Sequence, residues 1–150
     1  IYFTKSKQII GLREFLGIIR SNFIYPDHTI LSDNFLLGFV KKMDNRDLFI
    51  VLRNKSFQDI FTPIRTWENK MFYDLHEFFG LNLNLFSNYL PAKNFEDGIV
   101  ENKNARILYD NNGNIALVYI FVDENSLLIG SNLEATHEVM LRLSSSKIKK

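Results

Sequence analysis

The sequence predicts one α+β domain over residues 1–150, with a mainly antiparallel sheet of about six strands covered by three helices. The first observation is a pattern written twice. Residues 35–61 and 115–143 each contain an apolar strand, a polar turn beginning with Asp, a second apolar strand, a serine and an amphipathic helix. The second observation is the order of hairpin and then helix, which favours antiparallel pairing. We therefore expect two β-hairpin-helix units, and chance recurrence of a common motif is the alternative interpretation.

The composition is that of a globular protein with its own core. Hydrophobic residues make up 46% of the chain and charged residues 23%, both ordinary values. Fourteen Phe, six Tyr and one Trp indicate an aromatic-rich core. The net charge of +1 is evenly spread, so nothing predicts a nucleic-acid partner. The chain begins at Ile1 without a signal peptide, and we interpret it as a fragment or mature segment of a longer protein.

The N-terminal part predicts a short edge strand at residues 1–4 and a helix at residues 9–23. Apolar residues at helical spacing support this helix: Leu12, Phe15, Leu16, Ile19 and Phe23. Gly11 and Gly17 weaken it by about 1 kcal/mol each relative to Ala.

The first hairpin is predicted near residues 35–42 and 48–54. Leu48 to Leu52 are apolar at every position, which is typical of a strand buried on both faces. Ser56 stands where a helix N-cap belongs, and the following helix should run over residues 57–79.

That helix has one continuous apolar stripe, formed by Ile60, Ile64, Trp67, Met71, Leu75 and Phe78. Trp67 is expected in the core rather than in a stacking site. Pro63 should bend the helix because it removes one backbone donor. Gly80 is a natural stop signal, since glycine accepts the left-handed conformation that follows many helices.

Residues 81–104 form the least regular part of the sequence and should connect the two halves. A strand over residues 105–110 follows, and Asn112-Gly113 predicts a tight type I′ turn with positive φ at Gly113. Residues 115–122 are apolar throughout and should form a central strand, hydrogen-bonded on both edges.

A strand at residues 127–129 and a last helix complete the fold. Ser131 with Glu134 fits a capping box for that helix. Its apolar residues are Leu133, Val139 or Met140, and Leu143, and the basic tail of residues 144–150 should fray. We expect the helix of residues 57–79 and the C-terminal helix to share one face of the sheet, leaving the helix of residues 9–23, alone or with residues 81–104, to cover the other.

The residues that usually carry chemistry give little support for catalysis. There is no cysteine, and His28, His76 and His137 are too far apart in sequence to form a local metal-ligand pair. Asp74, His76 and Glu77 are interpreted as a solvated helix face. No phosphate loop, nucleophile elbow or zinc motif occurs, so we expect no metal or cofactor, and the chain is interpreted as a non-enzyme.

One resemblance rests on the spacing of Trp67-Glu68, Met71 and Asp74-Leu75, followed by the strand sequence IALVYIFVDENSLLIGS and the helix end Leu141-Arg142-Leu143. This pattern is similar to the extracytoplasmic part of uncharacterised membrane-anchored envelope proteins of candidate-phylum bacteria, over residues 35–143. Pro63 departs from that pattern. The resemblance implies a domain outside a membrane anchor, near surface-appendage or secretion machinery, and it carries over no functional residue.

The leading hypothesis is a non-catalytic interaction or assembly module that binds a protein partner or a second copy of itself. The thin cover on one face of the sheet should leave an apolar docking surface, formed by Phe23, Ile24, Tyr25, Phe86 and Tyr89.

The alternative is a sensor that binds a small ligand. Its pocket would lie between the sheet and residues 81–104, lined by Phe86, Tyr89 and Phe95. A cavity with converging polar groups would favour the sensor, and a closed aromatic core would favour the module. A hydrolase is the third and least supported hypothesis.

Overall fold

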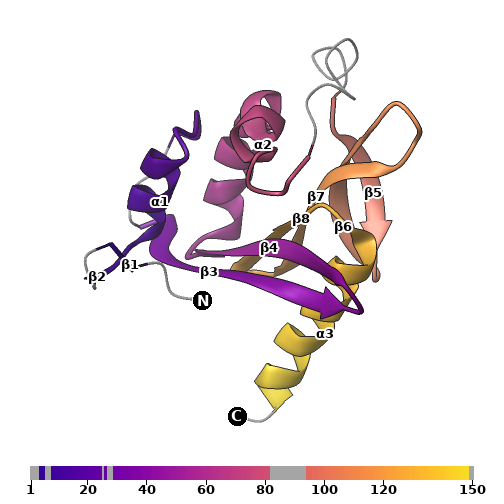
Figure 1. The fold of residues 1–150 in the computed structure, drawn as a ribbon. Helices are drawn as coiled ribbons and strands as arrows, with labels where there is room; N and C mark the ends of the chain where they lie inside the picture. The colour runs from indigo at the N-terminus through magenta and orange to yellow at the C-terminus, as the bar shows by residue number, and fades with distance from the viewer. Residues whose placement is uncertain (1–3, 6–7, 25, 27–28, 82–93, 149–150) are drawn as a thin grey trace.

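A computed structural model describes residues 4–5, 8–24, 26, 29–81 and 94–148. A six-stranded, fully antiparallel sheet has the order β3-β4-β8-β7-β6-β5 and is accompanied by three helices (Figure 1). The predicted α+β class is confirmed. The elements are β1 (Thr4–Lys5), β2 (Gln8–Ile9), α1 (Leu12–Ile18), β3 (Leu31–Lys42), β4 (Asn45–Asn54), α2 (Phe57–Leu75), β5 (Glu96–Val100), β6 (Lys103–Tyr109), β7 (Ile115–Asp123), β8 (Ser126–Gly130) and α3 (Leu133–Ile148).

The central position of β7 is also confirmed. Tyr119 pairs with Arg106 of β6 on one side and with Ile129 of β8 on the other. Six of the nine β7 residues are buried, because both pleat faces carry apolar residues that helices cover.

The helices divide between the two faces of the sheet, with α1 and α2 on one side and α3 on the other (Figure 1). Alternate residues of the central strands therefore belong to different cores. On the side of α1 and α2 lie Ile50, Leu52, Leu117, Leu127 and Ile129. On the side of α3 lie Val51, Val118, Ile120, Leu128, Val139 and Met140.

The expectation that α2 and the C-terminal helix share a face is wrong. The chain turns to one face after β4 and to the opposite face after β8, where α3 passes close to Gly130. A Cβ atom at Gly130 would lie 2.9 Å from Oγ1 of Thr136, so only glycine allows this approach without a shift.

The two hairpin-helix segments are not confirmed as equivalent units. A twofold axis between β4 and β8 would leave both helices on the same face. The turns also differ in register: the first hairpin turns between the paired residues Lys42 and Asn45, and the second between Asp123 and Ser126. The aligned pattern would instead place Asp44 and Asp123 at the same point.

The β6–β7 loop confirms one turn prediction and corrects another. Gly113 has φ +79°, as predicted, whereas Asn112 keeps a negative φ, so the type I′ turn is wrong. The loop is longer: the backbone N–H of Gly113 donates to the carbonyl of Asp110 (3.2 Å), and that of Asp110 donates to Asn114 (2.7 Å). Two consecutive positive φ values occur instead in the β5–β6 loop, at Glu101 (49°) and Asn102 (59°).

The C-terminal ends of α1 and α2 differ from the predicted helix boundaries. α1 stops early because Arg20 adopts φ 54° and the N–H of Ser21 donates to the carbonyl of Leu16 (2.9 Å), a Schellman-type end. α2 ends at Leu75, four residues before the predicted end, and turns continue from there to Gly80, which has φ 67° as the prediction of a left-handed glycine requires.

The caps of the two long helices were predicted with unequal success. The side chain of Ser56 accepts from the N–H of Asp59, which confirms the cap of α2. For α3 the capping side chain is Asn132, whose Oδ1 accepts from the N–H of Glu134 (2.8 Å), so the assignment to Ser131 is wrong by one residue. Among the described residues, no helix combines the length and hydropathy that a bilayer span requires.

Candidate functional site

A groove runs between α2 and the outer strands β5 and β6, and a polar bridge divides it into two hollows. The first hollow, of about 780 Å³, lies along the C-terminal half of α2. The second, of about 720 Å³, lies along its N-terminal half and is floored by β7. Figure 1 shows α2 across from the β5–β6 hairpin, which forms one edge of the sheet.

The bridge is the ion pair of Glu68 on α2 and Arg106 on β6. Nε and Nη2 of Arg106 donate to the two carboxylate oxygens of Glu68 at 2.9 and 3.0 Å. The same guanidinium donates to Asp97 Oδ1 (2.8 Å) and to the carbonyl of Phe95 (2.7 Å). Only 12% of the Arg106 side chain and 10% of the Glu68 side chain are exposed. One residue therefore ties α2 to both strands of the β5–β6 hairpin.

Tyr119 completes the bridge from the floor of the groove. Its hydroxyl donates to Glu68 Oε1 at 2.5 Å. Burial, and secondly this hydrogen bond, raise the pKa of Tyr119 well above its ordinary value. Its phenol therefore stays neutral at physiological pH. The hydrogen bond to Glu68 likewise raises the pKa of Arg106, which stays cationic.

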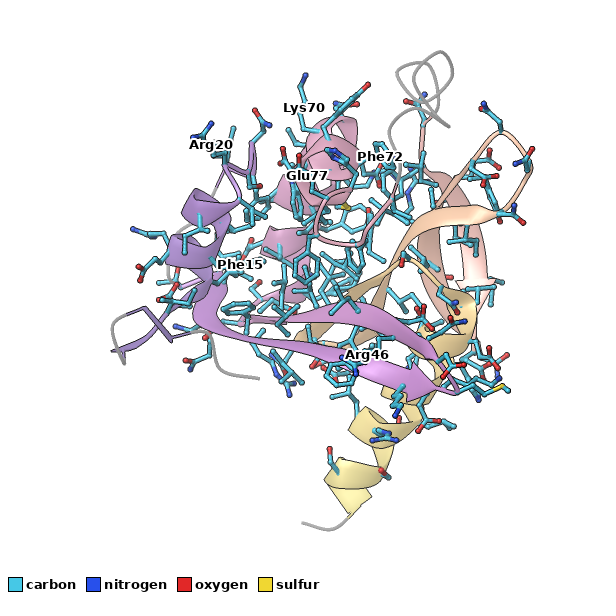
Figure 2. The ribbon with its side chains drawn as sticks, in the orientation of Figure 1. Phe15, Arg20, Arg46, Lys70, Phe72 and Glu77 are labelled. Atoms are coloured by element: carbon cyan, nitrogen blue, oxygen red, sulfur yellow. The ribbon has the colours of Figure 1, made fainter. Side chains whose placement is uncertain are left out.

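The first hollow is rich in hydrogen-bond donors. Three cationic side chains line it against the single carboxylate of Glu68, and two of them, Arg65 and Lys70, come from α2. Lys70 and Phe72 both extend from this helix (Figure 2). The remaining lining is amide, aromatic and aliphatic: Asn22, Asn69, Asn94, Phe72, Tyr73, Phe95 and Leu108.

Asn22 is held at this hollow by a buried carboxylate. Asp74 Oδ2 accepts from the backbone N–H of Asn22 (2.7 Å), from Ser21 Oγ (2.8 Å) and from Trp67 Nε1 (2.6 Å). Asp74 Oδ1 accepts from the amide of Asn22 at 2.6 Å. The interpretation of Asp74 as part of a solvated face is therefore wrong, because the carboxylate is only 9% exposed. Trp67 lies in the core as predicted, 4% exposed.

The second hollow has a different character, because aromatic rings form one side of it and carboxylates lie around it. Its rings are Phe57, Phe61, Tyr119 and Phe121, and its charged residues are Asp97, Lys103, Arg106, Asp123 and Glu124.

The residues of the predicted docking surface lie in different environments. Phe23 is buried, with its ring centroid 4.9 Å from that of Trp67. Ile24 is 78% exposed and borders a third, mostly apolar hollow of about 280 Å³ with Pro26 and Pro63. Tyr25, Phe86 and Tyr89 lie outside the described residues.

The predicted ligand pocket has one described member. Phe95 is buried and lines the first hollow, with its ring centroid 5.7 Å from that of Tyr119. Residues 81–104, expected to be irregular, contain β5 and the start of β6.

The bridge residues Glu68, Arg106 and Tyr119 were not predicted from the sequence. One signal could have indicated them: Arg106 lies between the apolar residues Ala105 and Ile107, and it pairs in register with Tyr119. Such a cation needs a buried partner, because an unpaired buried charge is strongly unfavourable.

Within the described part of the chain, no group of three or more His, Asp or Glu side chains is placed to hold a metal ion. Comparison with known proteins adds no relative: no protein-family model, no curated protein and no solved structure matches this chain.

Proposed function

We propose that this domain binds a small anionic or strongly polar ligand in the first hollow, and so acts as a ligand-binding or sensor domain. The observation that carries the proposal is the excess of donors in this hollow, where three cations and three amides surround one carboxylate. A concave site with a few converging polar groups is the usual form of a small-ligand site.

The pairing of charges within the hollow indicates which residues would bind the ligand. Arg106 is already matched by Glu68 and Asp97. Arg65 lies 3.8 Å from Glu68 and its side chain is 42% exposed, so this pair is weak. Arg65 and Lys70 therefore supply the charge that a ligand would neutralise, and Asn22 would orient it.

The test is an NMR titration of the protein with acetate, inorganic phosphate and acetamide, with acetamide serving as the uncharged match for acetate. We expect saturable shifts at Asn22 and Asn69 with the anions and much weaker shifts with acetamide. Lys70→Gln and Arg65→Gln should each weaken anion binding. Lys55→Gln, at the opposite end of α2, removes the same charge and should have no effect. Equal responses to acetate and acetamide, or to Lys70→Gln and Lys55→Gln, would contradict the proposal.

The interaction module is the second candidate, and the third hollow supports it. Ile24 stands exposed beside Pro26, Pro63 and Trp67, where an apolar side chain of a partner or second copy could insert. Sedimentation should then show self-association that Ile24→Glu abolishes. Ile99→Glu, which changes an equally exposed isoleucine on β5, should leave association intact. A strictly monomeric wild-type chain would remove self-association from consideration.

We also propose a location outside a membrane, and this proposal rests on the sequence resemblance alone. A reporter enzyme that is active only outside the cytoplasm, fused to the natural protein in its own cells, tests it. An inactive reporter on a stably produced fusion would count against this location.

A further inference from the structure

We propose that the second hollow binds an organic cation, such as an alkylammonium or quaternary ammonium group. This goes beyond the proposed function, because it concerns the other side of the Glu68–Arg106 bridge and a ligand of opposite charge. The two sites can therefore succeed or fail independently.

Aromatic rings supply the surface that such a cation prefers. The Phe121 ring centroid lies 4.8 Å from that of Phe57, 6.2 Å from that of Phe61 and 6.3 Å from that of Tyr119. Phe57 and Phe61 are 43% and 42% exposed, although they belong to a cluster next to the core. Ring faces left open to solvent in a hollow attract cations through their quadrupoles.

The protein itself places a cation on one of these rings. The guanidinium carbon of Arg65 lies 5.9 Å from the centroid of Phe61, within the range of a cation–π contact. Arg65 reaches this ring from the side of the bridge, since it also lies near Glu68. A ligand cation would use the part of the cluster nearer Phe57 and Phe121.

The charges around the hollow favour a cation over an anion. Three carboxylates line it, those of Asp97, Asp123 and Glu124. Asp97 and Arg106 form an ion pair with each other, so the net charge of the lining is negative because Asp123 and Glu124 outweigh Lys103. The carboxylates would supply the long-range attraction and the rings the contact surface.

The geometry points to an organic cation rather than a metal ion. A metal needs several oxygen ligands converging on one point. The described carboxylates do not form such a group, and the volume of about 720 Å³ far exceeds what an ion requires. A bulky, weakly hydrated ammonium matches separated carboxylates and an aromatic wall.

The experiment is an NMR titration of the protein with choline and with the neutral alcohol in which carbon replaces the ammonium nitrogen. The two probes have nearly the same shape, so their difference isolates the charge. We expect saturable shifts at Phe57, Phe61 and Phe121 with choline, and binding weaker by about threefold to tenfold or more for the alcohol. A second arm uses Nα-acetyl-lysine methylamide, and tighter binding of this probe would indicate a lysine side chain as the source of the cation.

Variants test whether choline binding requires an aromatic ring or only an apolar side chain. Phe57→Leu keeps an apolar side chain but removes the ring, and should weaken choline binding by about threefold or more without changing alcohol binding. Glu124→Gln should weaken choline binding and reduce its salt dependence, whereas Glu77→Gln, an exposed carboxylate beyond the end of α2, should not. Equal binding of choline and the alcohol, or no saturable response at the rings while the melting temperature shows a folded protein, would overturn the inference.

Discussion

Asp74 is the residue on which the geometry of the first hollow most depends. It accepts four hydrogen bonds, two of them from Asn22 and one each from Ser21 and Trp67. Hydrogen bonds to a charged acceptor are stronger than neutral ones, and their loss leaves buried donors unpaired. The carboxylate therefore joins the segment after α1 to the middle of α2.

We expect Asp74→Asn to lower the free energy of unfolding by about 2–4 kcal/mol. The substitution replaces one acceptor oxygen by an NH₂ group, which would face the N–H and O–H donors that now bind the carboxylate. Urea denaturation measures this. Glu77→Gln, an exposed carboxylate three residues further on and just beyond the end of α2, should change the free energy by less than about 0.5 kcal/mol. Similar values for the two variants would show that the network contributes little.

Substitution of Gly113 tests whether its positive φ requires glycine. With φ +79° it occupies a conformation that β-branched residues resist, so Gly113→Val should destabilise the fold by about 1–3 kcal/mol. Gly17→Ala is the opposite case, since the added Cβ meets nothing within 4 Å inside α1. It should stabilise by up to about 1 kcal/mol. An unchanged melting temperature for Gly113→Val would contradict the assignment of strain.

The raised pKa of Tyr119 predicts that the protein loses stability at alkaline pH. Its pKa is raised in the folded state by burial and by Glu68, whereas in the unfolded chain it ionises near about 10. Above that pH the folded state retains a proton that the unfolded state loses, so stability falls as the pH rises. Tyr119→Phe should make the unfolding free energy less dependent on pH above about 10. Parallel curves for the two proteins would contradict this explanation.

At the scale of elements, the Glu68–Arg106 bridge holds the β5–β6 hairpin to α2. Arg106→Met should cost about 3 kcal/mol or more, because it leaves the Glu68 carboxylate buried without its partner. Hydrogen exchange of the β5 amides should also accelerate, since β5 is an edge strand paired only with β6 among the described strands.

A matched surface pair serves as the control for this prediction. Arg142 and Glu138 of α3 form an ion pair with 76% and 39% of their side chains exposed. Arg142→Gln should therefore change stability by only about 0.5 kcal/mol or less. An Arg106→Met effect no larger than this would mean that the bridge does not stabilise the hairpin.

At the scale of the whole molecule, the sheet separates two cores. Leu127 and Leu128 are adjacent on β8, both fully buried, and belong to opposite cores. Leu127→Ala and Leu128→Ala should each cost about 2–5 kcal/mol, because each leaves a cavity in a packed interior. Leu141→Ala on α3, where the side chain is 53% exposed, should cost much less. A large effect at only one of the two β8 positions would contradict a sheet covered on both sides.

Local patterns in the sequence determined the class of the fold and most of its elements. The apolar run of β7, the cap at Ser56 and the glycines at 80 and 113 are each set by neighbouring residues, through side-chain periodicity and allowed φ values. Such signals act within a few residues, so they could be interpreted without knowing the rest of the chain. The predictions of the β6–β7 turn type and of the α3 cap were wrong by one or a few residues.

Only the tertiary structure decided which face each helix covers and how the groove is built. Glu68 and Arg106 are 38 residues apart, and Asp74 and Asn22 are 52 apart, so no local periodicity relates them. Each charged residue on an amphipathic helix looks solvated until a distant strand or loop buries it. Burial raises the energy of an unpaired charge, and the pairing that satisfies it depends on where the whole chain places its partner.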